Sequence, residues 1–196
     1  MRRAGKSKSS LAIQRLVLPH FTGPGKMIIA SFDLGGTVGF ACGGSDFPPW
    51  CGSHELPLTG DDVGAYLAAF DDWLYEMLAY KYIDLIAFEA PIIRPGKTSL
   101  ITARKLIGLS GHLEFIAHRR GIQCREMLIQ NIKKHLSGHG NATKTEMIYA
   151  AARLGMPGLD EHAADAFGGW LLALKSHAPE EWRKFIDRHK MDELTG

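Results

Sequence analysis

Two short apolar runs, each ending in an acid, constrain the fold of this chain more than any other feature. The first run, MIIASFD, covers residues 27–33, and the second, DLIAFE, covers residues 84–89. A tight LGGT turn follows Asp33, and a proline-containing stretch follows Glu89. Apolar runs of this length without alternating polar residues are typical of strands that are buried on both faces. We therefore expect helices on both sides of a sheet, and a carboxylate at the end of each buried strand.

The remaining pattern predicts three further strands and a set of amphipathic helices. A turn rich in Gly, Ser and Pro at residues 43–49 separates two of the strands, and residues 131–141, which are polar and contain Gly, indicate a loop. The order of elements favours an α/β fold with a five-stranded mixed sheet flanked by helices. The expected strands are Val38–Cys42, Cys51–Leu58 and Ile122–Leu128, and the expected helices are 63–78, 99–120, 145–154 and 161–175.

Length and composition indicate one domain with a tail at each end. The chain has 196 residues, of which 45% are hydrophobic, enough for one sizeable core. Residues 1–26 carry basic but no acidic residues, which predicts a flexible basic tail, with a DNA-contacting arm and a folded domain starting at Met27 as alternatives. The domain is expected to cover residues 27–178, and residues 179–196 to form a charged tail or a last exposed helix.

The cysteines and the short apolar segments favour a cytoplasmic protein. Cys42, Cys51 and Cys124 form no CxxC pair, so neither a disulfide framework nor a zinc site is indicated. The apolar stretch Leu16–Leu18 is too short for a signal peptide or a membrane span. A net charge of +2 is too small to predict a nucleic-acid partner by itself. We expect no membrane association and no small-molecule cofactor.

Three acids and one histidine are placed as a metal-dependent hydrolase would need them. Asp33 and Glu89 end strands, Asp165 lies in the first turns of a late helix, and His162 precedes it by three residues, on the same helical face. Divalent cations such as Mg²⁺ take oxygen ligands from carboxylates, and two ions about 4 Å apart can promote phosphodiester hydrolysis. His162 could bind metal or carry a proton. Taken singly, each residue could also be a helix cap or a turn former.

These residues resemble the motifs of the RuvC family of Holliday junction resolvases, which have the ribonuclease H-like fold. The resemblance covers about residues 27–177 and rests on DLGGTVG from Asp33, on Phe88-Glu89 and on HAADA from His162. In that family an Asp, a Glu and a helical pair spaced by three residues bind two magnesium ions. The resemblance implies two Mg²⁺ ions, or Mn²⁺, at Asp33, Glu89, His162 and Asp165, in a histidine-containing variant of the site.

The resemblance also implies contacts with branched DNA. The family has two lysines eleven positions apart around the scissile phosphate, and Lys133 and Lys144 match them, Lys144 as part of the catalytic set. Ile92 stands where the family typically has an aromatic side chain that enters the junction. A basic rim that contacts phosphates would surround the acids. Its further members would be Arg94, Lys97, Arg104, Lys105 and Lys134.

The implied activity is resolution of four-way DNA junctions by metal-dependent phosphodiester hydrolysis. Cutting two symmetry-related strands calls for a two-fold homodimer. Residues that could form its interface, or could instead pack in the core, are Leu106, Ile107, Gly108 and Gly111. The alternatives are a less selective nuclease of the same fold, a non-catalytic DNA-binding module, and a fragment of a sugar kinase or actin-like ATPase, whose phosphate loop shares the DLGGT pattern. The length and the single Gly-rich turn disfavour the kinase.

Overall fold

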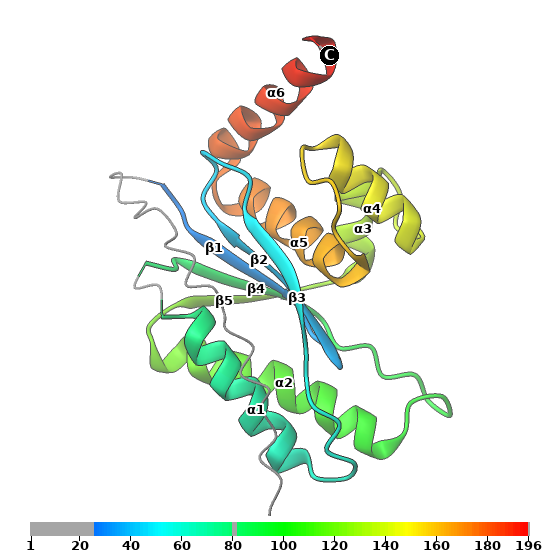
Figure 1. The fold of residues 1–196 in the computed structure, drawn as a ribbon. Coiled ribbons are helices and arrows are strands. Elements are labelled where there is room, and N and C mark those ends of the chain that lie inside the picture. Colours follow the sequence, from blue (N-terminus) through cyan, green and yellow to red (C-terminus); the bar gives the residue numbers. More distant parts are fainter. Residues whose placement is uncertain (1–25, 80–81, 196) are drawn as a thin grey trace, which may run out of the picture.

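A five-stranded mixed sheet forms the centre of the molecule (Figure 1). The structure, a computed structural model, describes residues 26–79 and 82–195, with side chains up to residue 189. In the sheet order β3-β2-β1-β4-β5, the first three strands are antiparallel, and β4 and β5 run parallel to β1. The predicted α/β fold with a mixed sheet is confirmed. The strands are β1 (Ile29–Asp33), β2 (Thr37–Gly43), β3 (Trp50–Glu55), β4 (Leu85–Glu89) and β5 (Gln123–Met127).

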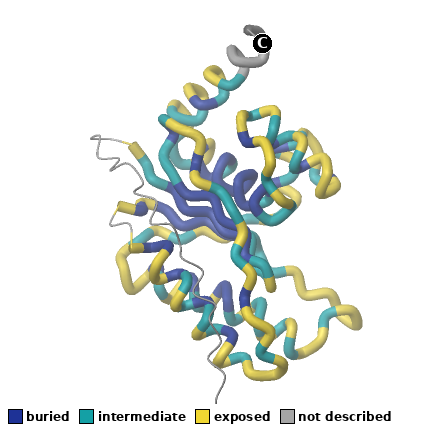
Figure 2. Tube along the Cα trace, viewed as in Figure 1, coloured by how far each residue is buried: buried dark blue, intermediate teal, exposed yellow. Residues whose placement is uncertain are grey.

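Helices cover both faces of the sheet (Figure 1). One layer holds α1 and α2, and the other holds α3, α4 and α5, with α6 continuing from the end of α5. The buried residues concentrate on the strands and on the faces of α1, α2 and α5 that contact them (Figure 2). Within residues 26–79 and 82–195, no helix has both the length and the apolar character needed to cross a membrane. The helices are α1 (Val63–Met77), α2 (Leu100–Arg119), α3 (Ile129–Ser137), α4 (Lys144–Arg153), α5 (Glu161–His177) and α6 (Pro179–Thr195).

Alternate residues of the two central strands point into separate cores. Ile29 of β1 belongs to the core beneath α5, whereas Phe32 of β1 and Phe88 of β4 belong to the core beneath α1 and α2. Phe32 and Phe88 are paired in register. Because successive side chains of a strand point to opposite faces, the next residues, Asp33 and Glu89, emerge together on the α5 face. Strand pairing thus brings the two terminal acids to the same end of the sheet.

Residues 129–137 form α3, so the predicted loop over residues 131–141 is wrong in its first half. Ile132 and Leu136 lie four residues apart and are buried in the core that α5 also joins. The helix ends at Gly138, whose φ of 94° lies in the left-handed region that favours glycine. The four-residue spacing of these apolar residues is typical of an amphipathic helix, but the polar residues around them favoured a loop.

The helix α6 packs against the rest of the fold. Phe185 is fully buried, and its ring centroid lies 5.2 Å from that of Trp170. Ser45 in the β2–β3 turn donates a hydrogen bond of 2.7 Å to Glu181, and Arg188 donates to the backbone oxygens of Ser45 and Asp46. These contacts fix the turn against α6. The predicted N-terminal tail, except for residue 26, lies outside the described residues.

A glycine in β2 allows α5 to lie against the sheet. A Cβ added to Gly39 would lie 2.0 Å from the carbonyl oxygen of His162, far inside any real contact distance. Gly39 is also paired in register with Asp33 of β1. The absence of a side chain at position 39 therefore lets the first turn of α5 lie beside Asp33.

We expect Gly39→Ala to lower the free energy of unfolding by about 3 kcal/mol or more, because the added methyl meets rigid backbone. Gly36→Ala is the matched control, since a Cβ there would meet nothing within 4 Å. Urea unfolding followed by circular dichroism measures both variants. Equal stability of the two would show that α5 does not depend on the close approach at residue 39.

His135 in α3 is a half-buried imidazole that is held neutral. Burial lowers its pKa to about 4, the positive charge of Lys175 acts in the same direction, and a backbone hydrogen bond with Leu171 opposes them. Its Nε2 atom is buried without a hydrogen-bond partner among the described residues, and the ring centroid lies 5.8 Å from that of Trp182. Protonation of this ring therefore disfavours the folded state.

His135 is expected to contribute a loss of stability as the pH falls from about 6.5, the ordinary pKa of histidine, toward 4. In this range His135 is protonated in the unfolded chain but stays neutral in the folded protein. We expect a loss on the order of 1 kcal/mol, allowing for solvent screening of a half-buried group. The His135→Gln variant should lack this component when chemical unfolding of both proteins is compared between pH 7 and pH 4.5. An identical pH dependence of the two would contradict the assignment.

Candidate active site

The end of β1 and the first turn of α5 are joined by a hydrogen bond between side chains. Asp33 Oδ2 and His162 Nδ1 lie 2.8 Å apart. Asp160 caps α5 by accepting a hydrogen bond of 2.9 Å from the backbone N–H of Ala163, and it also accepts one from Ser53 of β3. The cap and the contact with β3 fix the first turn of α5 over the strand ends. Asp33 and His162, 129 residues apart, are thereby brought together.

The carboxyl groups of Glu89 and Asp165 share the electrostatic environment of Asp33. The pKa of Glu89 is raised to about 8, mainly by burial and also by the charges of Asp33 and Asp165, while Lys133 opposes the rise. The pKa of Asp165 is raised to about 6, mainly by burial and also by the charge of Asp33, while Lys133 and His162 oppose the rise. Half-buried acids that repel one another in this way are stabilised in their ionised form by added positive charge.

Asp165 has an oxygen without a partner. Its Oδ1 atom is buried and accepts no hydrogen bond from the part of the chain that the structure describes. Leaving such an atom unpaired is costly, so a cation or a water molecule fits this position. Among the same residues, no group of three or more His, Cys, Asp or Glu side chains is already arranged around a common metal position. One oxygen of Asp33 is engaged by His162 instead.

His162 lies between two acids. The hydrogen bond to Asp33 raises its pKa, burial of the ring opposes this, and the charges of Asp33 and Glu161 raise it further. Its other ring nitrogen, Nε2, lies 3.6 Å from Glu161 Oε1. This environment favours the protonated imidazolium, which can donate a proton, whereas metal coordination needs the neutral ring.

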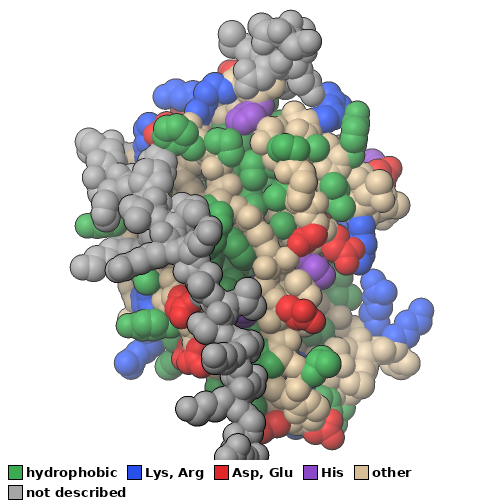
Figure 3. Space-filling model, in the orientation of Figure 1, with side chains coloured by type: hydrophobic (Ala, Val, Ile, Leu, Met, Phe, Trp, Pro, Cys, Tyr) green, Lys and Arg blue, Asp and Glu red, His purple; other side chains and the backbone are tan. Residues whose placement is uncertain are grey.

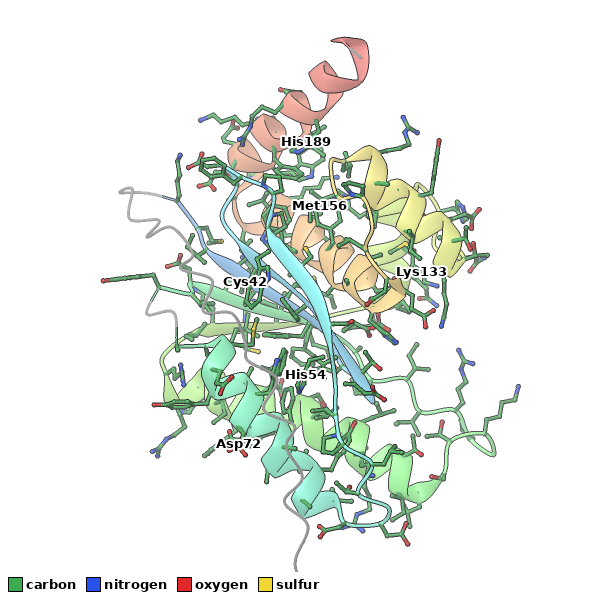
Figure 4. The ribbon with its side chains drawn as sticks, viewed as in Figure 1. Cys42, His54, Asp72, Lys133, Met156 and His189 are labelled. Carbon is green, nitrogen blue, oxygen red and sulfur yellow. The ribbon has the colours of Figure 1, made fainter. Side chains whose placement is uncertain are left out.

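The two lysines singled out in the sequence both lie near the acids but in different settings. Lys133, labelled in Figure 4 beside the start of α5, donates a hydrogen bond of 2.7 Å to the carbonyl oxygen of Ala142, and its charge acts on Glu89 and Asp165. Lys144 is the first residue of α4 and forms an ion pair with Glu161. Lys133 is therefore held inside the site, whereas Lys144 lies at its rim.

Glu161 is the residue at this site that the sequence analysis missed. It directly precedes His162, and its two oxygens face Lys144 and the imidazole. An acid in the first turn of a helix is common for electrostatic reasons, so its position alone gave no signal. Only the packing of α4 beside α5 shows that it connects a basic residue to the site.

The other predicted DNA contacts divide into two groups. Ile92, which is 42% exposed, and Arg94 and Lys97 lie on the exposed segment between Glu89 and α2. The ammonium of Lys105 donates a hydrogen bond of 2.8 Å to the carbonyl oxygen of Gly60 and lies 4.6 Å from the centre of the Tyr66 ring. Lys105 thus joins α2 to the start of α1.

The residues predicted for a dimer interface also differ in their surroundings. Ile107 is 56% exposed, and a Cβ on Gly111 would meet nothing within 4 Å. A Cβ on Gly108 would lie 3.1 Å from Leu67 of α1, so Gly108 serves close packing inside the fold, the alternative to an interface position. Ile107 and Gly111 remain on the outward face of α2.

On the face shown in Figure 3, acidic side chains gather around a histidine near the middle of the view, and basic side chains lie along the flank beside them. The site is open to solvent, since the side chains of Asp33 and His162 keep 18% and 33% of their surface exposed. An extended anionic ligand has access to such a surface, with the basic flank to offset its charge.

No protein-family model matches the chain, and no similar curated protein was found. Among solved structures, Thermus thermophilus RuvC is similar with a TM-score of 0.58 and 20% identity, over 76% of this chain and 95% of that one. The same protein in complex with a Holliday junction substrate has a TM-score of 0.60 and 20% identity, over 74% of this chain and 92% of that one. The yeast mitochondrial Holliday junction resolvase Ydc2 has a TM-score of 0.55 and 12% identity, over 81% of this chain and 84% of that one. The chain therefore has the ribonuclease H-like fold of these proteins.

Proposed function

We propose that this protein is a metal-dependent endonuclease that resolves four-way DNA junctions. The proposal rests on the Asp33–His162 hydrogen bond at the end of β1, with Glu89 and Asp165 near enough for their charges to interact with that of Asp33. The fold is shared with Ydc2, which is described as a Holliday junction resolvase, and with RuvC, which is known in complex with a Holliday junction substrate. A cluster of acids without a serine or cysteine nucleophile suits hydrolysis by an activated water.

Asp33, Glu89 and Asp165 would hold the metal through their carboxylate oxygens. The donor set is the one that Mg²⁺ or Mn²⁺ prefers, and the unpartnered Oδ1 of Asp165 offers a coordination position. Two bound ions would supply an activated water and would stabilise the charge that develops on the phosphodiester. Because all three acids interact with one another, ionisation of Glu89 depends on positive charge nearby.

His162 and the two lysines complete the proposed chemistry. His162 would hold a proton at Nε2 for the leaving oxygen, or would bind metal once neutral, and its bond to Asp33 orients the ring for either role. Lys133 would balance the negative charge of Glu89 and Asp165 from inside the site. Lys144, whose side chain is 69% exposed, would contact the substrate phosphate.

Branched DNA and a second copy of the chain are the proposed partners. The exposed segment with Ile92, Arg94 and Lys97 leaves β4 directly beyond Glu89, so it would meet DNA whose phosphate lies at the acids. A two-fold dimer would present two equivalent sites to one junction. Ile107 and Gly111 on the outward face of α2 are the residues that we propose for its interface.

Mg²⁺ is expected to raise the free energy of unfolding by about 2.7 kcal/mol at a concentration of 100 times its Kd. The Asp33→Asn variant should lose most of this gain, because the substitution removes a charged oxygen donor. Asp72→Asn is the matched control, since Asp72 is an exposed residue of α1 on the opposite face of the sheet (Figure 4). Thermal unfolding with and without Mg²⁺ measures the effect. A full gain in Asp33→Asn would exclude this carboxylate as a ligand.

With Mg²⁺, a synthetic four-way junction should be cut by paired, symmetric nicks, and linear duplex of the same sequence should be cut far more slowly. Asp165→Asn should reduce the cleavage rate by more than about 100-fold, since removing an outer partner of a metal ligand already costs up to that factor. Denaturing electrophoresis of end-labelled strands maps the cuts. Equal cutting of both substrates would favour a less selective nuclease, and junction binding without cleavage would favour a non-catalytic module.

A further inference from the structure

Lys144 is already engaged by an acid of its own chain. Lys144 at the start of α4 forms an ion pair with Glu161 Oε2 at the start of α5. The side chains of the two residues retain 69% and 34% of their surface exposed. The ammonium that would meet the substrate phosphate is therefore neutralised by a carboxylate while DNA is absent.

The cap of α5 does not depend on Glu161. Asp160 occupies the N-cap position and accepts the hydrogen bond from Ala163, and it is also tied to Ser53 of β3. The oxygens of Glu161 instead face Lys144 and, at 3.6 Å from Oε1, the Nε2 atom of His162. Glu161 thus lies between a predicted phosphate contact and the imidazole without being needed to start the helix.

An exposed ion pair of this kind is easily exchanged. Such pairs contribute from nothing to about 1 kcal/mol, because water screens the charges and the side chains lose freedom. A DNA phosphate competes for the same ammonium, and the released carboxylate then stands near the phosphate and repels it. Glu161 can turn toward the imidazole of His162, whose Nε2 atom already lies 3.6 Å from its Oε1 atom.

Resting on the proposed function, we propose that Glu161 competes with the DNA phosphate for Lys144 and so weakens DNA binding at the active site. The paired residues contribute no net charge to the contact with DNA, so they release no counterions from it. When the charge of Glu161 is removed, Lys144 becomes one additional cation that can contact the DNA. The slope of log binding constant against log salt concentration then steepens by about 0.9.

The test compares Glu161→Gln with the wild-type protein in binding a fluorescent four-way junction, in EDTA so that no cleavage occurs, over a range of salt concentrations. We expect Glu161→Gln to bind about threefold to tenfold more tightly at low salt, with the steeper slope. Glu180→Gln is the matched control, because it makes the same charge change on an exposed residue of α6. The 17 residues of α5 separate the two positions by about 25 Å, well beyond the screening length of about 10 Å.

The same comparison in a Lys144→Met background tests whether the effect acts through the lysine. There, Glu161→Gln should tighten binding less than it does in the wild type, since no lysine is left to be released. Equal slopes for wild type and Glu161→Gln, or the same steepening in Glu180→Gln, would overturn the inference while leaving the proposed function intact. A wild-type protein that binds no junction would overturn the proposed function and the inference with it.

Discussion

The close approach of α5 to the sheet is the constraint on which the rest of the site depends. The backbone of His162 lies so near Gly39 that no other residue fits at position 39. Since Gly39 is paired with Asp33, this approach places the imidazole within hydrogen-bond distance of the strand-end carboxylate. The absence of a side chain at residue 39 thus allows β1 to contact the helix that carries Asp165.

The charged residues of this site form two groups, one in its interior and one at its rim. In the interior, Glu89 and Asp165 are half-buried acids whose pKa values are raised by burial and by Asp33, and Lys133 opposes the rise. Burial and mutual repulsion thus disfavour the ionised forms of these acids, and added positive charge would stabilise them. At the rim, the charge of Lys144 is offset by Glu161. Because this ion pair is exposed and weak, an anionic ligand could take the place of Glu161.

Much of the site's composition could be predicted from the sequence. The uninterrupted apolar runs that end at Asp33 and Glu89 indicated buried strands with acids at their ends, and the structure has both. The spacing of His162 and Asp165 placed them on one helical face. The sequence analysis missed α3 around Ile132, because polar residues dominate that segment.

The sequence by itself determined the strand and helix order and which acids stand at strand ends, because side-chain periodicity and turn residues act over a few neighbouring positions. Only the tertiary structure decided which groups meet. The Asp33–His162 bond, the Lys144–Glu161 pair and the seating of Gly108 against Leu67 all join separate elements. Such contacts depend on how the helices lie on the sheet, which is set by the packing of the whole core and is not encoded in any single segment.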